Sequence, residues 1–251
     1  MTFPRPEEAT SYELGLKTTI NEGLRVNAAI FQIDYDDQLT QYQYQPYFNT
    51  NSGTPAETST AFFYNVDAQV RGAEIEVASN PINNLVLNTN LSYSKIEAKG
   101  GQAPCRDPSR PLSATNVINL CEVESGKTLN ASPEFQASVN GNYLVPLATV
   151  DAYLRFVVSY QGENENYGAS IEEGKAYTVT DLYAGVKSKD SDWDVGLYAK
   201  NAFDRSVVLT RNDIITGSGL DSYFGPSGYQ RISTIAEREV GLSFRYNFAA
   251  N

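Results

Sequence analysis

The chain has 251 residues, of which 41% are apolar and 20% charged, a composition typical of a folded chain. Its net charge is −11 and it has no histidine, so we expect no nucleic acid partner and exclude histidine-dependent zinc sites and catalytic triads. Tyrosine is abundant, with 17 residues, and suits strands whose side chains meet both apolar and wet surroundings. Composition alone favours a tyrosine-rich soluble β-sandwich.

Apolar and polar residues alternate with a period of two in five segments, the pattern of a strand with one apolar face. In residues 11–20, Tyr12 and Leu14 fall on one face, while Glu13 and Lys17 fall on the other. The other four segments are residues 85–94, 150–161, 193–200 and 239–248.

Four further segments alternate less cleanly, namely residues 24–40, 70–79, 135–145 and 176–187. Residues 28–31 are apolar on both faces, and a bulge there would reset the register of the strand. Together the two groups of segments predict about nine strands.

The predicted connections alternate between short and long. The short ones are residues 21–23, 81–84, 146–149 and 188–192. The long ones are residues 45–57, 98–130, 163–175 and 205–233. This alternation is typical of an up-and-down barrel with tight turns at one rim and large loops at the other.

Periodicity leaves two fold classes open. The apolar face packs inward in a soluble sandwich, whereas it meets lipid in a membrane barrel whose polar face lines the lumen. Strands of ten or more residues exceed the usual soluble length of about five or six. They suit a tilted path across an apolar band of about 25 Å, so strand length and loop alternation favour the membrane barrel.

The two cysteines, Cys105 and Cys121, are 16 positions apart in a polar stretch. Such a pair predicts one loop disulfide on the extracellular side and an oxidising compartment. The alternative is a pair of unpaired thiols in a cytosolic protein.

No run of 18 apolar residues predicts a membrane-spanning helix. Residues 1–4 are not a basic segment leading into an apolar one, so the sequence as given shows no signal peptide. The sequence therefore indicates either a truncated barrel protein or a protein that does not enter a membrane.

No combination of side chains predicts catalysis, so we do not expect an enzyme. Glu74 and Glu76 are two residues apart on one face, where lining of a barrel lumen is the simpler interpretation. Aromatic residues in the long loops could stack on sugar rings or catechol-like groups, and the alternative is an aromatic girdle at the membrane boundary. The candidate ligand contacts are Tyr47, Phe48, Tyr167, Tyr223, Phe224 and Tyr229.

Three stretches resemble the TonB-dependent receptor family. The stretch FPRPEEATSYELGLKTTI resembles a family segment that precedes a barrel strand. NVDAQVRGAEIEV is similar to a second family pattern, and LYAKNAFDRSVV to a signature near the end of the barrel. The matching positions are Tyr12, Glu13, Gly15, Lys17, Gly72, Glu74, Glu76, Asn201, Phe203 and Asp204.

The resemblance implies an all-β, antiparallel, up-and-down transmembrane barrel of about 22 strands around an α+β plug. Residues 1–251 would be the carboxy-terminal portion of that barrel, about nine strands, with the plug absent from this chain. The implied function is receptor-mediated uptake, energised by TonB, of a ferric siderophore, a cobalamin-like cofactor or an oligosaccharide.

The resemblance also implies location and partners. The location would be the bacterial outer membrane, and the partners its lipid, the ligand, and the TonB complex acting through the amino-terminal part. No cofactor is implied. The alternative function is a passive porin-like or structural barrel without energy coupling.

Overall fold

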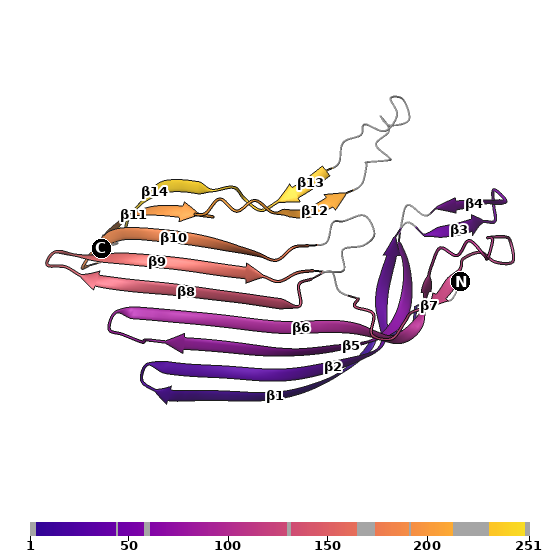
Figure 1. Ribbon diagram of the computed structural model, residues 1–251, viewed down its shortest axis with the longest axis horizontal. Coiled ribbons are helices and arrows are strands. Elements are labelled where there is room, and N and C mark those ends of the chain that lie inside the picture. The colour runs from indigo at the N-terminus through magenta and orange to yellow at the C-terminus, as the bar shows by residue number, and fades with distance from the viewer. Residues whose placement is uncertain are drawn as a thin grey trace, which may run out of the picture. The chain divides into compact units, whose positions relative to one another are not determined.

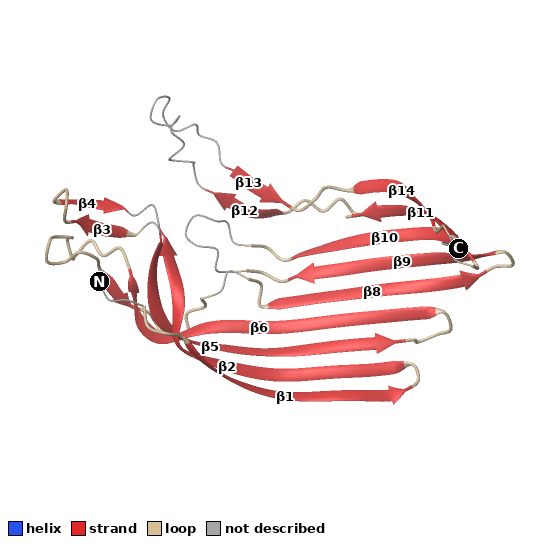
Figure 2. Cartoon of the chain, turned by 180° about the vertical axis from the view of Figure 1, so that it is seen from behind, coloured by secondary structure: helices blue, strands red, loops and turns tan. Residues whose placement is uncertain are grey.

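The computed structural model describes residues 4–43, 45–57, 61–129, 132–164, 174–190, 192–212 and 231–248. All regular structure in these ranges is β-strand, which confirms the all-β prediction (Figure 2). Within the same ranges, no helix is long and apolar enough to cross a membrane. The strands are β1 (Glu8–Asn21), β2 (Leu24–Gln43), β3 (Pro46–Asn49), β4 (Thr54–Glu57), β5 (Ala61–Ser79), β6 (Leu85–Pro104), β7 (Leu120–Glu122), β8 (Phe135–Pro146), β9 (Val150–Gln161), β10 (Tyr177–Ser188), β11 (Trp193–Lys200), β12 (Val208–Asn212), β13 (Arg231–Thr234) and β14 (Glu239–Tyr246).

The chain forms two compact units. Unit 1 comprises Met1–Leu14, Ile30–Gly72 and Ser94–Asn130, and unit 2 comprises Gly15–Ala29, Ala73–Tyr93 and Ala131–Asn251. The four long strands β1, β2, β5 and β6 each contribute residues to both units.

Unit 2 is built on an antiparallel sheet with the strand order β1-β2-β5-β6-β8-β9-β10-β11-β14 (Figure 1). The nine strands on this path agree with the predicted number, and each pairs with its neighbour in sequence once the small hairpins and β7 are set aside. Among the described residues, β1 and β14 each have one neighbour on the path, so no closure is seen there.

The apolar residues of neighbouring strands are in register on one face of the sheet. Leu85 pairs with Tyr143, which pairs with Leu154 on the next strand. Leu197 pairs with Leu242 in the same way. Directly paired residues point to the same side of a sheet, so these side chains form a continuous apolar surface.

This apolar surface is exposed. Leu242 is 75% exposed, Phe244 71% and Leu197 58%. A soluble sandwich would bury these side chains in a core between two sheets, so their exposure argues against that alternative. An apolar face open over many strands is what a barrel wall presents to lipid.

Unit 1 has a small core of its own. Its buried apolar residues are Val66, Ala68, Ala98 and Ala103. Gly101 has a φ of 122°, and a Cβ there would lie 3.2 Å from the Cα of Val66. Glycine therefore allows both the left-handed backbone and the close approach of the two segments.

The long connections contain structure that alternation did not predict. β3 and β4 form a hairpin inside residues 45–57, and β12 pairs with β13, which ends at Thr234, one residue past the predicted connection 205–233. β6 extends to Pro104, and β7 pairs with its end. The five short strands have three to five residues each, too few to show the sustained alternation that marks the nine longer ones.

The bulge considered at residues 28–31 is absent. Side chains of β2 and β5 bond in one antiparallel register on both sides of it, Asn27 with Glu76 and Gln32 with Arg71. The irregular backbone lies instead at Asp37, which has a φ of 58°. Residues 28–31, which are apolar on both faces, include the point where β2 leaves unit 2 and enters unit 1.

Candidate functional site

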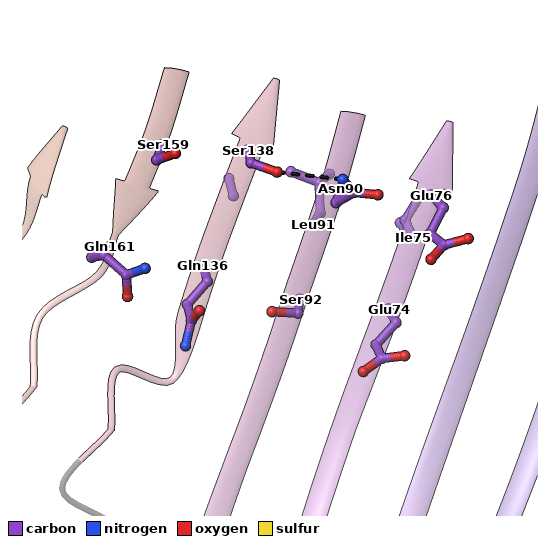
Figure 3. Close-up of a pocket in the computed structure, with 11 residues that line it drawn as sticks. Glu74, Ile75, Glu76, Asn90, Leu91, Ser92, Gln136, Ser138, Ser159 and Gln161 are labelled. Carbon is purple, nitrogen blue, oxygen red and sulfur yellow. Dashed lines mark hydrogen bonds between the residues drawn. The ribbon is translucent and has the colours of Figure 1, made fainter. Parts of the chain in front are cut away.

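Polar side chains on the face opposite the apolar surface line a shallow pocket of about 320 Å³ in unit 2 (Figure 3). They come from alternate positions of four neighbouring strands, β5, β6, β8 and β9, which is why they share one face. The polar lining residues are Glu74, Glu76, Asn90, Ser92, Gln136, Ser138, Ser159 and Gln161.

Cross-strand hydrogen bonds hold this polar face. The Asn90 amide donates to the Ser138 hydroxyl at 3.4 Å, as Figure 3 shows. The Asn27 amide donates to the Glu76 carboxylate at 3.1 Å. Two carboxylates therefore lie beside a set of neutral donors and acceptors, a surface that water and polar ligands can wet.

A second polar cluster lies farther along the same sheet. Tyr153, 8% exposed, donates its hydroxyl hydrogen to Asp194 at 2.8 Å. It crosses Gly185 and Gly196, where an added Cβ would lie 2.5 and 2.6 Å from its hydroxyl oxygen. The Arg155 guanidinium stacks on the Tyr153 ring at 4.5 Å, which closes the cluster.

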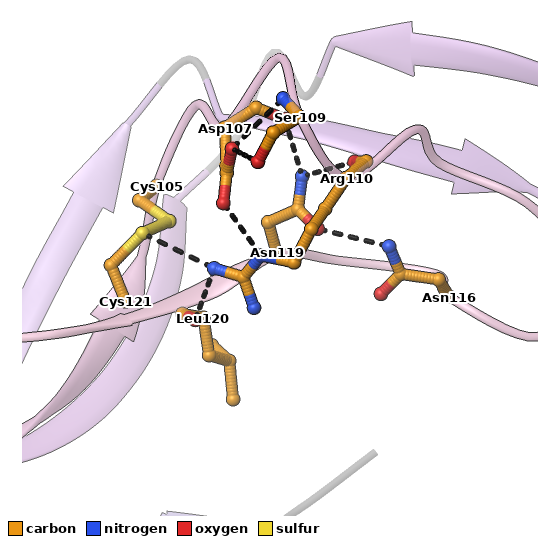
Figure 4. The surroundings of a disulfide bond; sticks show 8 residues. All are labelled: Cys105, Asp107, Ser109, Arg110, Asn116, Asn119, Leu120 and Cys121. Carbon is orange, nitrogen blue, oxygen red and sulfur yellow. Dashed lines mark hydrogen bonds and ion pairs between the residues drawn. A yellow bond between two sulfur atoms is a disulfide. The ribbon is translucent and has the colours of Figure 1, made fainter.

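Unit 1 carries a loop closed by the Cys105–Cys121 disulfide, with the Cα atoms 5.8 Å apart (Figure 4). Inside the loop, Asn119 is 3% exposed and donates to the carbonyl oxygens of Asp107 and Arg110. The backbone N–H of Cys105 donates to the carbonyl of Asn119 at 3.0 Å. The loop is therefore held from within as well as by its covalent bond.

Asp107 and Arg110 form the charged pair of this loop. The Arg110 Nε donates to the Asp107 carboxylate at 2.6 Å. The Ser109 hydroxyl hydrogen bond, followed by the bond from Arg110, lowers the pKa of Asp107 to about 2. Asp107 is therefore ionised across the physiological range.

The β3–β4 hairpin contacts this loop at Phe48 and contacts β5 through Tyr47. The backbone N–H of Phe48 donates to the Val117 carbonyl at 2.7 Å. The Tyr47 ring meets Phe62 edge-on, with centroids 6.1 Å apart. The remaining candidate contacts, Tyr167, Tyr223, Phe224 and Tyr229, lie outside the described residues.

The first two family motifs lie on long strands. Tyr12, Glu13, Gly15 and Lys17 are on β1, and the Tyr12 side chain is 62% exposed on the apolar face. The second motif, on β5, places Gly72 in the strand and Glu74 and Glu76 in the polar pocket.

Asn65, which opens the second motif, ties three backbone segments together. Its side chain accepts from the backbone N–H of Arg5 and donates to the carbonyls of Arg5 and Asp37. The Arg5 guanidinium also pairs with the Asp37 carboxylate. Asn65, on β5, therefore holds the segment that precedes β1 against β2.

The third motif forms a clasp after β11. Asn201 is 4% exposed and has a φ of 44°, a conformation that asparagine tolerates better than most residues. Its amide donates to the carbonyls of Arg205 and Ala236, so it joins the two arms that lead into and out of the β12–β13 hairpin. Asp204 adds a bond from the Arg238 N–H, whereas Phe203 is 76% exposed.

Sequence reasoning missed the partners that make these sites. Tyr153 and Asp194 are 41 positions apart, and no local pattern marks one as the partner of the other. The sequence marks three further residues only as polar positions between two cysteines, namely Asp107, Arg110 and Asn119. Among the described residues, no group of His, Cys, Asp or Glu is arranged to hold a metal ion.

An antiparallel sheet with an exposed apolar face and a polar opposite face defines the wall of a β-barrel. The family described as "TonB dependent receptor-like, beta-barrel" matches residues 3–202. The chain belongs to this family, as its three motifs implied.

Solved structures show the same fold. The ferric yersiniabactin uptake receptor FyuA from Yersinia pestis is 16% identical with a TM-score of 0.63, and the match covers 97% of this chain and 30% of that one. The copper transporter OprC is 13% identical with a TM-score of 0.61, covering 98% and 32%. The pyoverdine outer membrane receptor FpvA from Pseudomonas aeruginosa PAO1, bound to pyoverdine, is 16% identical with a TM-score of 0.60, covering 98% and 30%.

The chain spans about a third or less of these receptors, with 32% as the largest share among the three. At such identities the likeness shows the fold. Comparison with curated protein sequences found no match.

Proposed function

We propose that the chain supplies the carboxy-terminal portion of the barrel wall of an outer-membrane receptor that takes up a scarce small ligand with energy delivered through TonB. The observation that carries this proposal is the two-faced sheet. Its apolar residues are exposed and in register, while the opposite face carries the polar pocket. Lipid on one side and a hydrated lumen on the other suit these two faces.

The family and its solved members support a receptor over a passive pore. FyuA is described as a ferric yersiniabactin uptake receptor, FpvA as a pyoverdine outer membrane receptor, and OprC as a copper transporter. By analogy, the ligand of this protein is a metal chelate or a molecule of similar scarcity. A cobalamin-like cofactor or an oligosaccharide would use the same route.

The ligand-facing surface is assigned to the β3–β4 hairpin and the disulfide loop beside it. Tyr47 and Phe48 would offer aromatic surface to the ligand, together with Tyr167, Tyr223, Phe224 and Tyr229 from other long loops. Glu74 and Glu76 would line the path on the lumenal side.

The test is uptake by cells that lack the gene and carry the full coding region on a plasmid. Radiolabelled iron is supplied in a panel of ferric siderophores, and labelled cobalamin and a maltooligosaccharide are tested beside it. Uptake that requires both this gene and a working TonB supports the proposal. Uptake that persists without TonB would assign a passive pore instead.

The site is tested in the same assay. Tyr47→Ala and Phe48→Ala should weaken ligand binding, measured on whole cells, while the amount of protein in the membrane stays unchanged. Phe203→Ala is the control, because this exposed aromatic side chain lies in the clasp after β11 and not on the β3–β4 hairpin. Equal losses for all three variants would count against this surface.

A further inference from the structure

The two sulfurs of the loop disulfide have different surroundings. The Nη2 atom of Arg110 lies 3.5 Å from the Cys121 sulfur and 2.9 Å from the Leu120 carbonyl oxygen (Figure 4). Among the hydrogen bonds of the described residues, only the sulfur of Cys121 receives an arginine N–H. The pair is therefore electrostatically asymmetric.

Asp107 fixes the arginine in this position. Its carboxylate takes the Nε edge of the Arg110 guanidinium, which leaves the Nη2 atom facing the sulfur and the carbonyl. The carboxylate offsets part of the positive charge, but the N–H of Arg110 still points at the atom on which negative charge would develop. Hydrogen bonds to an ionised acceptor are about twice as strong as neutral ones.

We propose that this disulfide is a directional exchange site, in which a partner thiol attacks the sulfur of Cys105 and Cys121 departs as the thiolate. The partner is a thiol, free in solution or carried by a thiol–disulfide exchange protein. Its thiolate forms a new S–S bond with Cys105, the Cys105–Cys121 bond breaks, and the electron pair of that bond stays on Cys121 beside Arg110.

The same arrangement works in reverse during maturation. The Cys121 thiolate attacks Cys105 in the mixed disulfide, the loop bond re-forms, and the partner leaves as its thiolate. A basic neighbour favours the thiolate form of a cysteine, and a more acidic leaving thiol departs faster. Both directions therefore assign the mixed disulfide to Cys105.

Both cysteines are half-buried, so a thiol can approach the pair. Opening the bond would release the covalent closure around Asn119 and around Val117, which holds Phe48 of the β3–β4 hairpin. Exchange at this site would thus loosen two segments of unit 1 together.

The test uses the protein in membranes isolated from cells that produce it. Glutathione is added, exchange is stopped by acid, free thiols are alkylated, and peptide mass spectrometry locates each group. We expect glutathione on Cys105 and the alkyl group on Cys121, with a preference of about threefold or more, because a leaving thiolate that is stabilised by Arg110 departs faster. A preference for Cys121, or no exchange at all, would overturn the proposal.

Three variants separate charge from loop structure. Arg110→Gln should bring the two adducts to near parity, and Arg110→Lys should keep most of the preference. Arg106→Gln removes an arginine beside Cys105 and should leave the preference in place. In the fully reduced protein, Cys121 should also react with iodoacetamide faster than Cys105, and equal rates in the unaltered protein would contradict the assignment.

Discussion

The single residue with the most consequences in unit 2 is Tyr153, because its position depends on glycines of other strands. Gly196→Ala would place a methyl group 2.6 Å from the Tyr153 hydroxyl oxygen, so the ring must swing away and lose its bond to Asp194. We expect a loss of about 1–3 kcal/mol in the free energy of unfolding. The measurement is urea unfolding in detergent of the protein expressed from the full coding region, monitored by tryptophan fluorescence.

A double-mutant cycle is the control for this prediction. In a Tyr153→Ala background the added methyl group meets no ring, so the Gly196→Ala penalty should largely disappear. A penalty that persists unchanged would show that Gly196 is required by its backbone and not by the tyrosine.

Asp107 gives the disulfide loop a defined pH dependence. The pKa of this carboxyl falls from its ordinary value of 3.8 to about 2 in the folded loop. A lowered pKa contributes stability that is fully present above the unfolded value and is lost as the pH falls through the folded value. We therefore expect amide protection in residues 105–121 to be constant from neutral pH to about 4 and to decline toward about 2.

Hydrogen exchange with mass spectrometry across this pH range measures the effect, after correction for intrinsic exchange rates. Asp107→Asn should give lower protection with no pH-dependent decline between about 4 and 2, because the titrating group is gone. A decline of the same size in this variant would assign it to another carboxyl.

At the scale of the strand, the assignment of faces predicts opposite responses to charge. Leu154 and Ser159 lie on the same strand, β9, but Leu154 is on the apolar surface and Ser159 lines the polar pocket. Leu154→Arg should cost about 2–4 kcal/mol if it sits near the bilayer midplane, whereas Ser159→Arg faces the lumen and should be tolerated.

For both variants, the measured quantity is the amount of expressed protein that stays in the membrane when the membrane is extracted with urea. Leu154 is 50% exposed, so on a water-facing surface an arginine there would be harmless. Equal insertion of the two variants would therefore contradict the lipid-facing assignment of this surface.

The strands that sequence alone predicted are those in which one environment persists for many residues. β14 alternates throughout, and β9 does so apart from Tyr153 and Val157, because each side of the strand meets a single medium along its length. β3, β4, β12 and β13 have only four or five residues each, too few for a period of two to stand out. The clasp of Asn201 and the partners of Arg110 depend on tertiary contacts, so the motif marked Asn201 without showing what it holds.

At the scale of the whole chain, the number of strands restricts how the sheet can be completed. Among the described residues, the path from β1 to β14 has nine antiparallel strands, both edges included, so the two edge strands run in the same direction. Copies of this chain related by an axis along the membrane normal would meet edge to edge with parallel strands. An all-antiparallel barrel has an even number of strands, so completing this sheet requires an odd number from elsewhere.

This topology predicts that residues 1–251 alone, exported with an added signal peptide, neither seal into a barrel by self-assembly nor support uptake. Unpaired backbone groups along β1 and β14 cannot remain in hydrocarbon, where each costs several kcal/mol, so aggregation through these edges is the expected outcome. Gel mobility before and after heating is the measurement, since closed barrels resist detergent until heated. A compact heat-modifiable band, or TonB-dependent uptake by this segment alone, would refute the argument. If expression of the full coding region restores both the heat-modifiable band and TonB-dependent uptake, the strands that pair with β1 and β14 lie in the same gene product.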